Sequence, residues 1–314
     1  MNSRNAQTAL VRRTVGPNVW LAQPGDDAAS VLARTEPRAL RPDVLPTEDA
    51  VGQAMLEELE SVARAKSGDV VIALLGGRGA QALHRLLGER SKRGDLALIS
   101  RLHVFTQDAL APLRLDNGFS FVRDFERLLG LDFFRQVKSF TTFDTAAADL
   151  EAEVDRYVAR LNELGGLDIF FLGHGPEAEA ASHLAYIKPA SGASAADVAG
   201  LIPISSSILE HHVSKFKAGG SVVSETDEAE CRRATHILTL GPAAILGAKR
   251  IVQSVVDAST APAKKASYRR VLETTFAPTP AERAKQLDEN PGLWVRLHPN
   301  LRSIVLPDVL EGAR

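Results

Sequence analysis

A glycine-rich segment, Gly76-Gly77-Arg78-Gly79, follows the apolar run 70–75 and leads into a predicted helix. Glycines let backbone amides approach a ligand closely, and the start of a helix favours an anion. The planar guanidinium of Arg78 matches the geometry of phosphate. The segment lacks the Gly-Lys-Ser/Thr ending of a P-loop, and it does not match GxGxxG. We therefore interpret Gly76, Gly77, Arg78 and Gly79 as a phosphate-binding loop; a tight turn is the alternative.

Side chains that can transfer protons or hold an anion follow other apolar runs. Asp108 lies in an apolar setting, where burial would raise its pKa and let it shuttle a proton, although a cap or turn residue would look the same. His174 and His183 lie nearest the end of a central run, and histidine transfers protons near neutral pH. Lys264 and Lys265 follow a later run. Because ligands of open α/β sheets bind beyond the carboxyl ends of the strands, we expect these groups to meet at one edge.

The elements that would position these groups alternate between helices and apolar strands. The runs 70–75 and 167–172 are continuously apolar, which is typical of parallel strands buried on both faces. Thr47 and Asp144 are predicted to cap two of the helices. This alternation predicts an α/β fold with an open, mostly parallel, Rossmann-like sheet and helices on both faces. Further predicted strands are 102–105, 137–141, 236–240, 251–256, 293–297 and 303–306, and further predicted helices are 79–90, 120–129, 144–164, 242–249 and 261–273.

Composition limits the class of protein. The 314 residues are 45% hydrophobic and carry a net charge of −2, which is ordinary for a globular chain and makes nucleic acid a poor partner. We find no apolar run long enough to span a membrane and no signal peptide, so we expect a cytoplasmic protein. The lone Cys231 excludes an intrachain disulfide framework and a cysteine-rich zinc site. We expect no metal and no cofactor, an N-terminal extension over 1–45, and a single domain over 46–314.

Six segments in the same order resemble motifs of the glucosamine-6-phosphate deaminase and 6-phosphogluconolactonase family. The resemblance covers roughly residues 48–308 and implies a fold of the sugar-phosphate isomerase type, a sugar phosphate as ligand, and a chain that could form a homo-oligomer. The segments are Leu74-Leu75-Gly76-Gly77, Val104-Phe105-Thr106-Gln107-Asp108, Phe171-Leu172-Gly173-His174-Gly175-Pro176, Ser182-His183-Leu184-Ala185-Tyr186-Ile187-Lys188-Pro189, Leu238-Thr239-Leu240-Gly241 with Ala244-Ile245-Leu246-Gly247-Ala248, and Arg296-Leu297-His298-Pro299-Asn300.

The resemblance also implies roles for individual residues. The loop 76–79 would hold the sugar phosphate, helped by Lys264 or Lys265. Asp108 would match the acidic residue that moves a proton between C1 and C2 in the deaminase. His183 would match the histidine that assists ring opening in the deaminase, or attack by water in the lactonase.

The sequence departs from the family motifs at several of these positions. Arg78-Gly79 replaces the hydroxyl residue and proline of the loop, and Ala109 replaces a second carboxylate. Glu177 is separated from His183 by intervening residues, and Lys188 stands where the family has a glutamate. The arginine expected near 205–212 is missing. The carboxylate–histidine–carboxylate relay therefore cannot take its usual form, and a lysine beside the histidine would lower the pKa of the imidazole.

Three functions remain open at this point. The first is isomerisation or deamination of a phosphorylated sugar or amino sugar, the second is hydrolysis of a sugar-phosphate lactone, and the third is a sugar-phosphate sensor or a family member with new chemistry. A base at the C1–C2 proton would suffice for isomerisation, whereas lactone hydrolysis needs a base for water and a cation near the oxyanion. The candidate catalytic residues are Asp108, His174, Glu177, His183 and Lys188.

Overall fold

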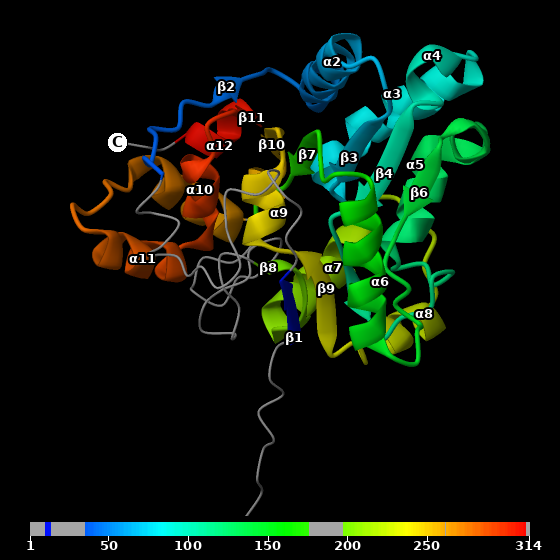
Figure 1. Cartoon of the computed structure of the whole chain (residues 1–314). Coiled ribbons are helices and arrows are strands. Elements are labelled where there is room, and N and C mark those ends of the chain that lie inside the picture. The colour runs from blue at the N-terminus through cyan, green and yellow to red at the C-terminus, as the bar shows by residue number, and fades with distance from the viewer. Residues whose placement is uncertain (1–9, 14–34, 176–196, 261, 312–314) are drawn as a thin grey trace, which may run out of the picture.

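The main sheet consists of seven parallel strands in the order β2-β11-β10-β7-β3-β4-β6. The computed structural model describes residues 10–13, 35–175, 197–260 and 262–311. Figure 1 shows the sheet running through the middle of the molecule between two groups of helices. The strands are β2 (Asp43–Val44), β11 (Leu301–Val305), β10 (Arg250–Val255), β7 (Ile169–Leu172), β3 (Val70–Leu74), β4 (Leu102–Thr106) and β6 (Ser139–Thr141).

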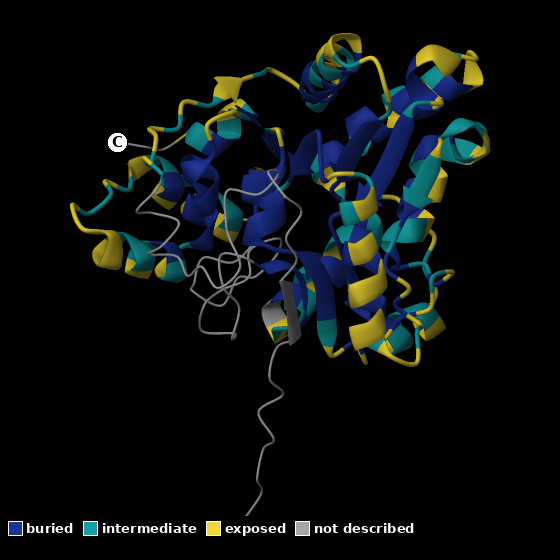
Figure 2. Cartoon of the chain, in the orientation of Figure 1, coloured by how far each residue is buried: buried dark blue, intermediate teal, exposed yellow. Residues whose placement is uncertain are grey.

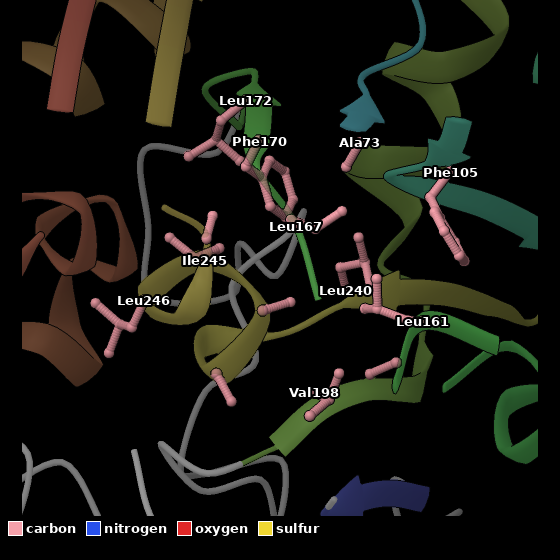
Figure 3. Close-up of a cluster of buried hydrophobic side chains, with 14 of the residues drawn as sticks. Ala73, Phe105, Leu161, Leu167, Phe170, Leu172, Val198, Leu240, Ile245 and Leu246 are labelled. Carbon is pink, nitrogen blue, oxygen red and sulfur yellow. The ribbon is translucent and has the colours of Figure 1, made fainter. Parts of the chain in front are cut away.

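Both faces of the main sheet are covered, which explains why its central strands are apolar at every position. In β3, Ile72 packs with α2 (Glu48–Ala65), α3 (Gln81–Lys92) and α5 (Phe121–Gln136). Ala73 points to the opposite face, where Phe170 and Leu240 pack beneath α6 (Leu150–Glu163) and α9 (Pro242–Gly247) (Figure 3). The central strands are buried throughout (Figure 2). The predicted α/β class and the helices on both faces are confirmed.

A second sheet, of four antiparallel strands, packs against the main one in the order β1-β8-β9-β5. β4 passes into β5 (Asp108–Ala111) with only Gln107 between the two strands. β9 (His236–Leu240) was predicted as a strand of the parallel sheet, but it pairs antiparallel with β5 and with β8 (Asp197–Pro203). The prediction was wrong about the sheet because a short apolar run does not encode the direction of its neighbours. β1 spans Leu10–Arg13.

Other segments differ from the predictions in their boundaries or their type. Helix α6 begins at the N-cap Asp149, not Asp144, because Asp149 accepts hydrogen bonds from two backbone amides of the first turn. Residues 293–297 belong to a 3-10 helix, not a strand. Strands β1 and β2 lie within the predicted extension 1–45 and pair with β8 and β11; the division at residue 45 stays a prediction. The remaining helices are α4 (Leu96–Ile99), α7 (Ser206–Ala218), α8 (Glu225–Cys231), α10 (Pro262–Glu273), α11 (Pro280–Glu289) and α12 (Pro307–Leu310), and the 3-10 helices are η1 (Arg78–Ala80), η3 (Ala258–Thr260) and η4 (Pro291–Leu297).

A membrane-spanning helix would have to be both long and strongly apolar. None of the helices in the described part of the chain meets both conditions.

Candidate functional site

A cleft lies at the carboxyl ends of β3, β4, β7 and β10, where the sequence predicted that the polar groups would meet. It encloses about 850 Å³ of empty space, counting the part open to solvent. Apolar side chains such as Leu110, Phe121 and Ile237 form part of the wall. The polar and ionisable side chains that line the cleft are Arg78, Gln107, Asp108, His174, His211, His212, Lys215, Ser254, Asp257 and Lys264.

The loop 76–79 requires its glycines for two different physical reasons. A Cβ on Gly76 would lie 2.1 Å from Cδ1 of Phe121, so only glycine fits there. Gly77 has a φ of +74°, a conformation that glycine adopts without strain. The hydroxyl of Ser254 donates to the carbonyl of Gly79 at 2.7 Å, which ties the loop to β10. No side chain caps the start of η1 or of α3, and the backbone N–H groups of Ala80 and Gln81 donate to the carbonyls of Gly77 and Arg78.

Arg78 lines the cleft but already has an anionic partner. Its Nε donates to Oε1 of Glu48 at 2.9 Å, and this pairing raises the pKa of the guanidinium. The Arg78 side chain is 40% exposed. Its charge is therefore partly neutralised and screened by solvent, and its contribution to binding an anion is correspondingly small.

Asp108 is the first residue of β5 and is buried in the wall of the cleft. Burial raises the pKa of its carboxyl to about 7. The amide nitrogen of Gln107 lies 3.5 Å from Oδ2 of Asp108, and its amide oxygen accepts from the N–H of Gly173 at 3.4 Å. Gln107 thus links the carboxyl to the loop after β7. A carboxyl group with this pKa can both accept and donate a proton near neutral pH.

Three charged side chains from different elements form what we call the carboxyl-end cluster: Lys215, Asp257 and Lys264. The ammonium of Lys264 lies 2.8 Å from Oδ1 of Asp257, and that of Lys215 lies 3.1 Å from Oδ2. Burial disfavours the ionised carboxyl, but the two lysines outweigh it and hold the pKa of Asp257 well below its usual range. The side chains are only 12% (Lys264) and 16% (Lys215) exposed. Lys265 does not line the cleft.

His174 lines the cleft as predicted, and it also joins two elements. Its Nε2 lies 2.6 Å from the hydroxyl of Ser267 on α10, and its ring meets Tyr268 edge to face. Burial, and then the charge of Lys264, lower the pKa of His174 to about 3. The imidazole is therefore neutral at physiological pH. It connects the loop after β7 to the helix that carries Lys264.

The cleft also contains side chains that were not assigned to it from the sequence, among them His211, His212 and Lys215 of α7 and Ser254 of β10. His211 and Lys215 are four residues apart on α7 and therefore lie on the same face of that helix. Burial, followed by the charges of Lys264 and Lys215, lowers the pKa of His211 to about 4. The neighbouring His212 is held by a 2.7 Å hydrogen bond to the carbonyl of Phe119 and stacks on Phe216, so its role is structural. The signal available in the sequence was the four-residue spacing of His211 and Lys215 in the segment HHVSK, which predicts that both lie on one face of a helix.

Three predicted catalytic residues, Glu177, His183 and Lys188, lie outside the described residues. Cys231 is buried, and burial raises the pKa of its thiol to about 12, so the thiol is unreactive. Within the described ranges, no three His, Cys, Asp or Glu side chains come close enough together to hold a metal ion.

No protein-family model and no curated protein sequence matches the chain. Several solved structures, however, are similar to it. A monomeric glucosamine-6-phosphate deaminase is 19% identical, with a TM-score of 0.66 over 86% of this chain and 98% of that one. The 6-phosphogluconolactonases from Trypanosoma cruzi and Trypanosoma brucei are 16% and 17% identical, with TM-scores of 0.61 and 0.59; each match covers 88% of this chain, and 99% and 100% of the respective enzyme.

At 16–19% identity the likenesses speak for the fold and not for a particular reaction. The chain has the fold shared by glucosamine-6-phosphate deaminase and 6-phosphogluconolactonase, as its motifs predicted.

Proposed function

We propose that the chain binds a phosphorylated sugar in the cleft and interconverts its aldose and ketose forms, with deamination if the sugar carries an amino group. One observation carries the proposal. Asp108, a buried carboxyl whose pKa is raised to about 7, lines the same cleft as the carboxyl-end cluster. The cleft is thus lined both by cations and by a group that can exchange protons.

The phosphate would lie against Lys215 and Lys264. Charge-assisted hydrogen bonds are about twice as strong as neutral ones, and low exposure strengthens them further. Asp257 keeps both ammonium groups in place and leaves the cluster with a net positive charge. The glycine loop, in which η1 begins, would add backbone N–H donors.

The sugar carbons would lie toward Asp108. Above its pKa the carboxylate would take the proton from C2 of the open-chain aldose and return it to C1, while the hydroxyl proton on O2 passes to the carbonyl oxygen O1, so that aldose and ketose carry the same number of protons. Gln107 would hold the orientation of the carboxyl through its contact with Oδ2. The apolar wall, which includes Leu110 and Ile237, would limit access of water to the proton in transit.

Lactone hydrolysis is the second candidate. Two of the structures compared above are 6-phosphogluconolactonases, and an ionised Asp108 could activate water instead of a carbon acid, with a lysine of the cluster near the oxyanion. A pH-stat assay with freshly prepared 6-phosphogluconolactone tests this reaction directly.

Two assays test the leading proposal: release of ammonia from glucosamine 6-phosphate, and interconversion of glucose 6-phosphate and fructose 6-phosphate followed by NMR. Activity should rise as the pH increases through about 7, because Asp108 must be ionised to act as a base. Asp108→Asn should lower kcat by roughly 10²- to 10⁴-fold, with ligand affinity changed little. Asp116→Asn, at an exposed aspartate outside the cleft, is the matched control.

Two results would contradict the proposal. One is full activity in Asp108→Asn. The other is a thermal shift with sugar phosphates but no turnover of any of them, which would instead support a protein that only binds the ligand.

A further inference from the structure

His211 lies beside the carboxyl-end cluster but has no part in the proton transfer proposed above. It reaches the cleft from α7, one helical turn before Lys215, while Lys264 comes from α10 and Asp257 from the loop after β10. The half-buried ring is thus placed among groups from three separate segments of the chain.

The surroundings of this ring favour its neutral form. Burial is the largest cause of the lowered pKa of His211, and the ammonium groups of Lys264 and Lys215 lower that pKa further, while Asp257 raises it. Two further ionisable neighbours on α7 are His212, whose own pKa is lowered to about 4 by burial, and Glu210, which pairs with Arg232. The other ionisable groups that line the cleft are Arg78, Asp108 and His174.

A bound dianion would reverse this balance. The two ammonium groups and one carboxylate of the cluster together carry a single positive charge. A phosphate ester with two negative charges changes the net charge beside His211 to negative. An opposite charge within several ångströms favours the protonated form of an imidazole.

We propose that His211 takes up a proton when a dianionic phosphate binds the carboxyl-end cluster, and that the resulting imidazolium becomes the third cationic group holding that phosphate. This inference rests on the anion site of the proposed function, but not on the reaction. It makes the affinity for the phosphate depend on pH: binding tightens as the pH falls toward about 5, because a proton enters together with the anion.

Sulfate is the probe, because it stays a dianion between pH 5 and 7 and so can neither supply nor take up the proton itself. Titration calorimetry at pH 6 in two buffers with different heats of ionisation measures the protons taken up per sulfate bound. The wild-type chain should take up on the order of one proton, and its sulfate affinity should fall by up to about tenfold per pH unit between pH 5 and 7.

His211→Gln should abolish the uptake and flatten this pH dependence, while its melting temperature without ligand reports that it folds. His236→Gln, at a histidine that does not line the cleft, should behave like the wild type. Repeating the three titrations in an Asp108→Asn background removes a second group in the cleft that could bind a proton, and uptake by the neutral His174 would show itself by persisting in His211→Gln.

Each alternative outcome is decisive. Sulfate binding without proton uptake, or uptake that persists in His211→Gln, would overturn this inference and leave the anion site intact. Failure of the wild-type chain to bind sulfate at all would overturn both the inference on His211 and the proposed anion site.

Discussion

Among the residues that the structure describes, two buried carboxylates, Asp257 and Asp168, are each held between two lysines, at opposite ends of the parallel sheet. Asp257 lies between Lys215 and Lys264 in the carboxyl-end cluster. At the amino ends of the strands, Asp168 accepts from Lys66 at 2.7 Å and from Lys249 at 2.8 Å, and we call these three residues the amino-end cluster. Asp168 also accepts from the backbone N–H of Val71 at 2.8 Å.

The chemical groups are the same, but their surroundings differ. The lysines of the amino-end cluster are 35% and 63% exposed and do not line the cleft described above, so water can reach their remaining donors. Lys215 and Lys264 are largely shielded and line a cleft. The lesson is that a lysine–aspartate–lysine set indicates a site for an anion only where shielded ammonium groups face a space that a ligand can enter. Elsewhere the same set holds strand ends together.

The largest predicted effect is a gain in the free energy of unfolding when Asp108, at the carboxyl ends of the parallel strands, is replaced by asparagine. The folded state keeps Asp108 protonated up to about pH 7, whereas the unfolded chain ionises it near 3.8. Stability therefore falls as the pH rises from about 4 to 7. Asp108→Asn should stabilise the fold by roughly 4 kcal/mol at pH 8, and the gain should shrink toward pH 4. Urea unfolding at several pH values checks this, and a destabilised variant would show that burial does not penalise the carboxylate.

The next effect concerns ligand affinity. Lys264→Met should weaken binding of a phosphorylated sugar by about 10- to 100-fold, since a shielded charge-assisted hydrogen bond is lost. Lys249→Met, the matched change in the amino-end cluster, should leave affinity within about twofold. Calorimetry with glucose 6-phosphate measures both. Equal losses in the two variants would remove the distinction between the clusters.

Changes in the amino-end cluster should alter the free energy of unfolding and not the ligand affinity. Asp168→Asn should cost roughly 2 kcal/mol of unfolding free energy, discounted because both lysines reach solvent. The two lysines and the Val71 amide outweigh burial and lower the pKa of Asp168 in the folded state. Its contribution should therefore be present above about pH 4 and be lost as the pH falls below that. Ligand affinity should not change, and a change would place this cluster in the binding site.

The smallest effect is expected at Arg78. Because Glu48 already pairs with its partly exposed guanidinium, Arg78→Ala should weaken phosphate-ester binding only about two- to fivefold. The affinity for a neutral sugar should stay the same. A loss as large as that of Lys264→Met would mean that Arg78 leaves Glu48 when the ligand binds.

Much of this cleft could be anticipated because its loops directly follow buried strands. Strands covered on both faces must be apolar throughout, so β3 and β7 stand out in the sequence, and so do the groups after them, the loop 76–79 and His174. Asp108 and Lys264 were found by the same reasoning. Glycine at position 76 is explained by Phe121, which is distant in sequence, so the reason for that residue became visible only in the fold.

The remainder depends on how elements pack over long distances. His211 and Lys215 lie on a helix, and no local pattern says which cleft a helix faces. Asp257 directly follows a predicted strand, but its pairing with two lysines joins α7 and α10, which are separate in the chain. β9 has the composition of a buried strand in either sheet, so its antiparallel pairing could not be deduced from residues 236–240 alone.

The passage from β4 into β5 through the single residue Gln107 has a consequence for how this protein can vary. Side chains alternate between the faces of a strand, so inserting or deleting one residue there would turn the carboxyl group at the start of β5 away from the cleft and toward the core. The stretch from β4 to β5 should therefore accept changes of side chain far more readily than changes of length. Chains with this fold that keep proton chemistry at this position should preserve the spacing even where they share few residues.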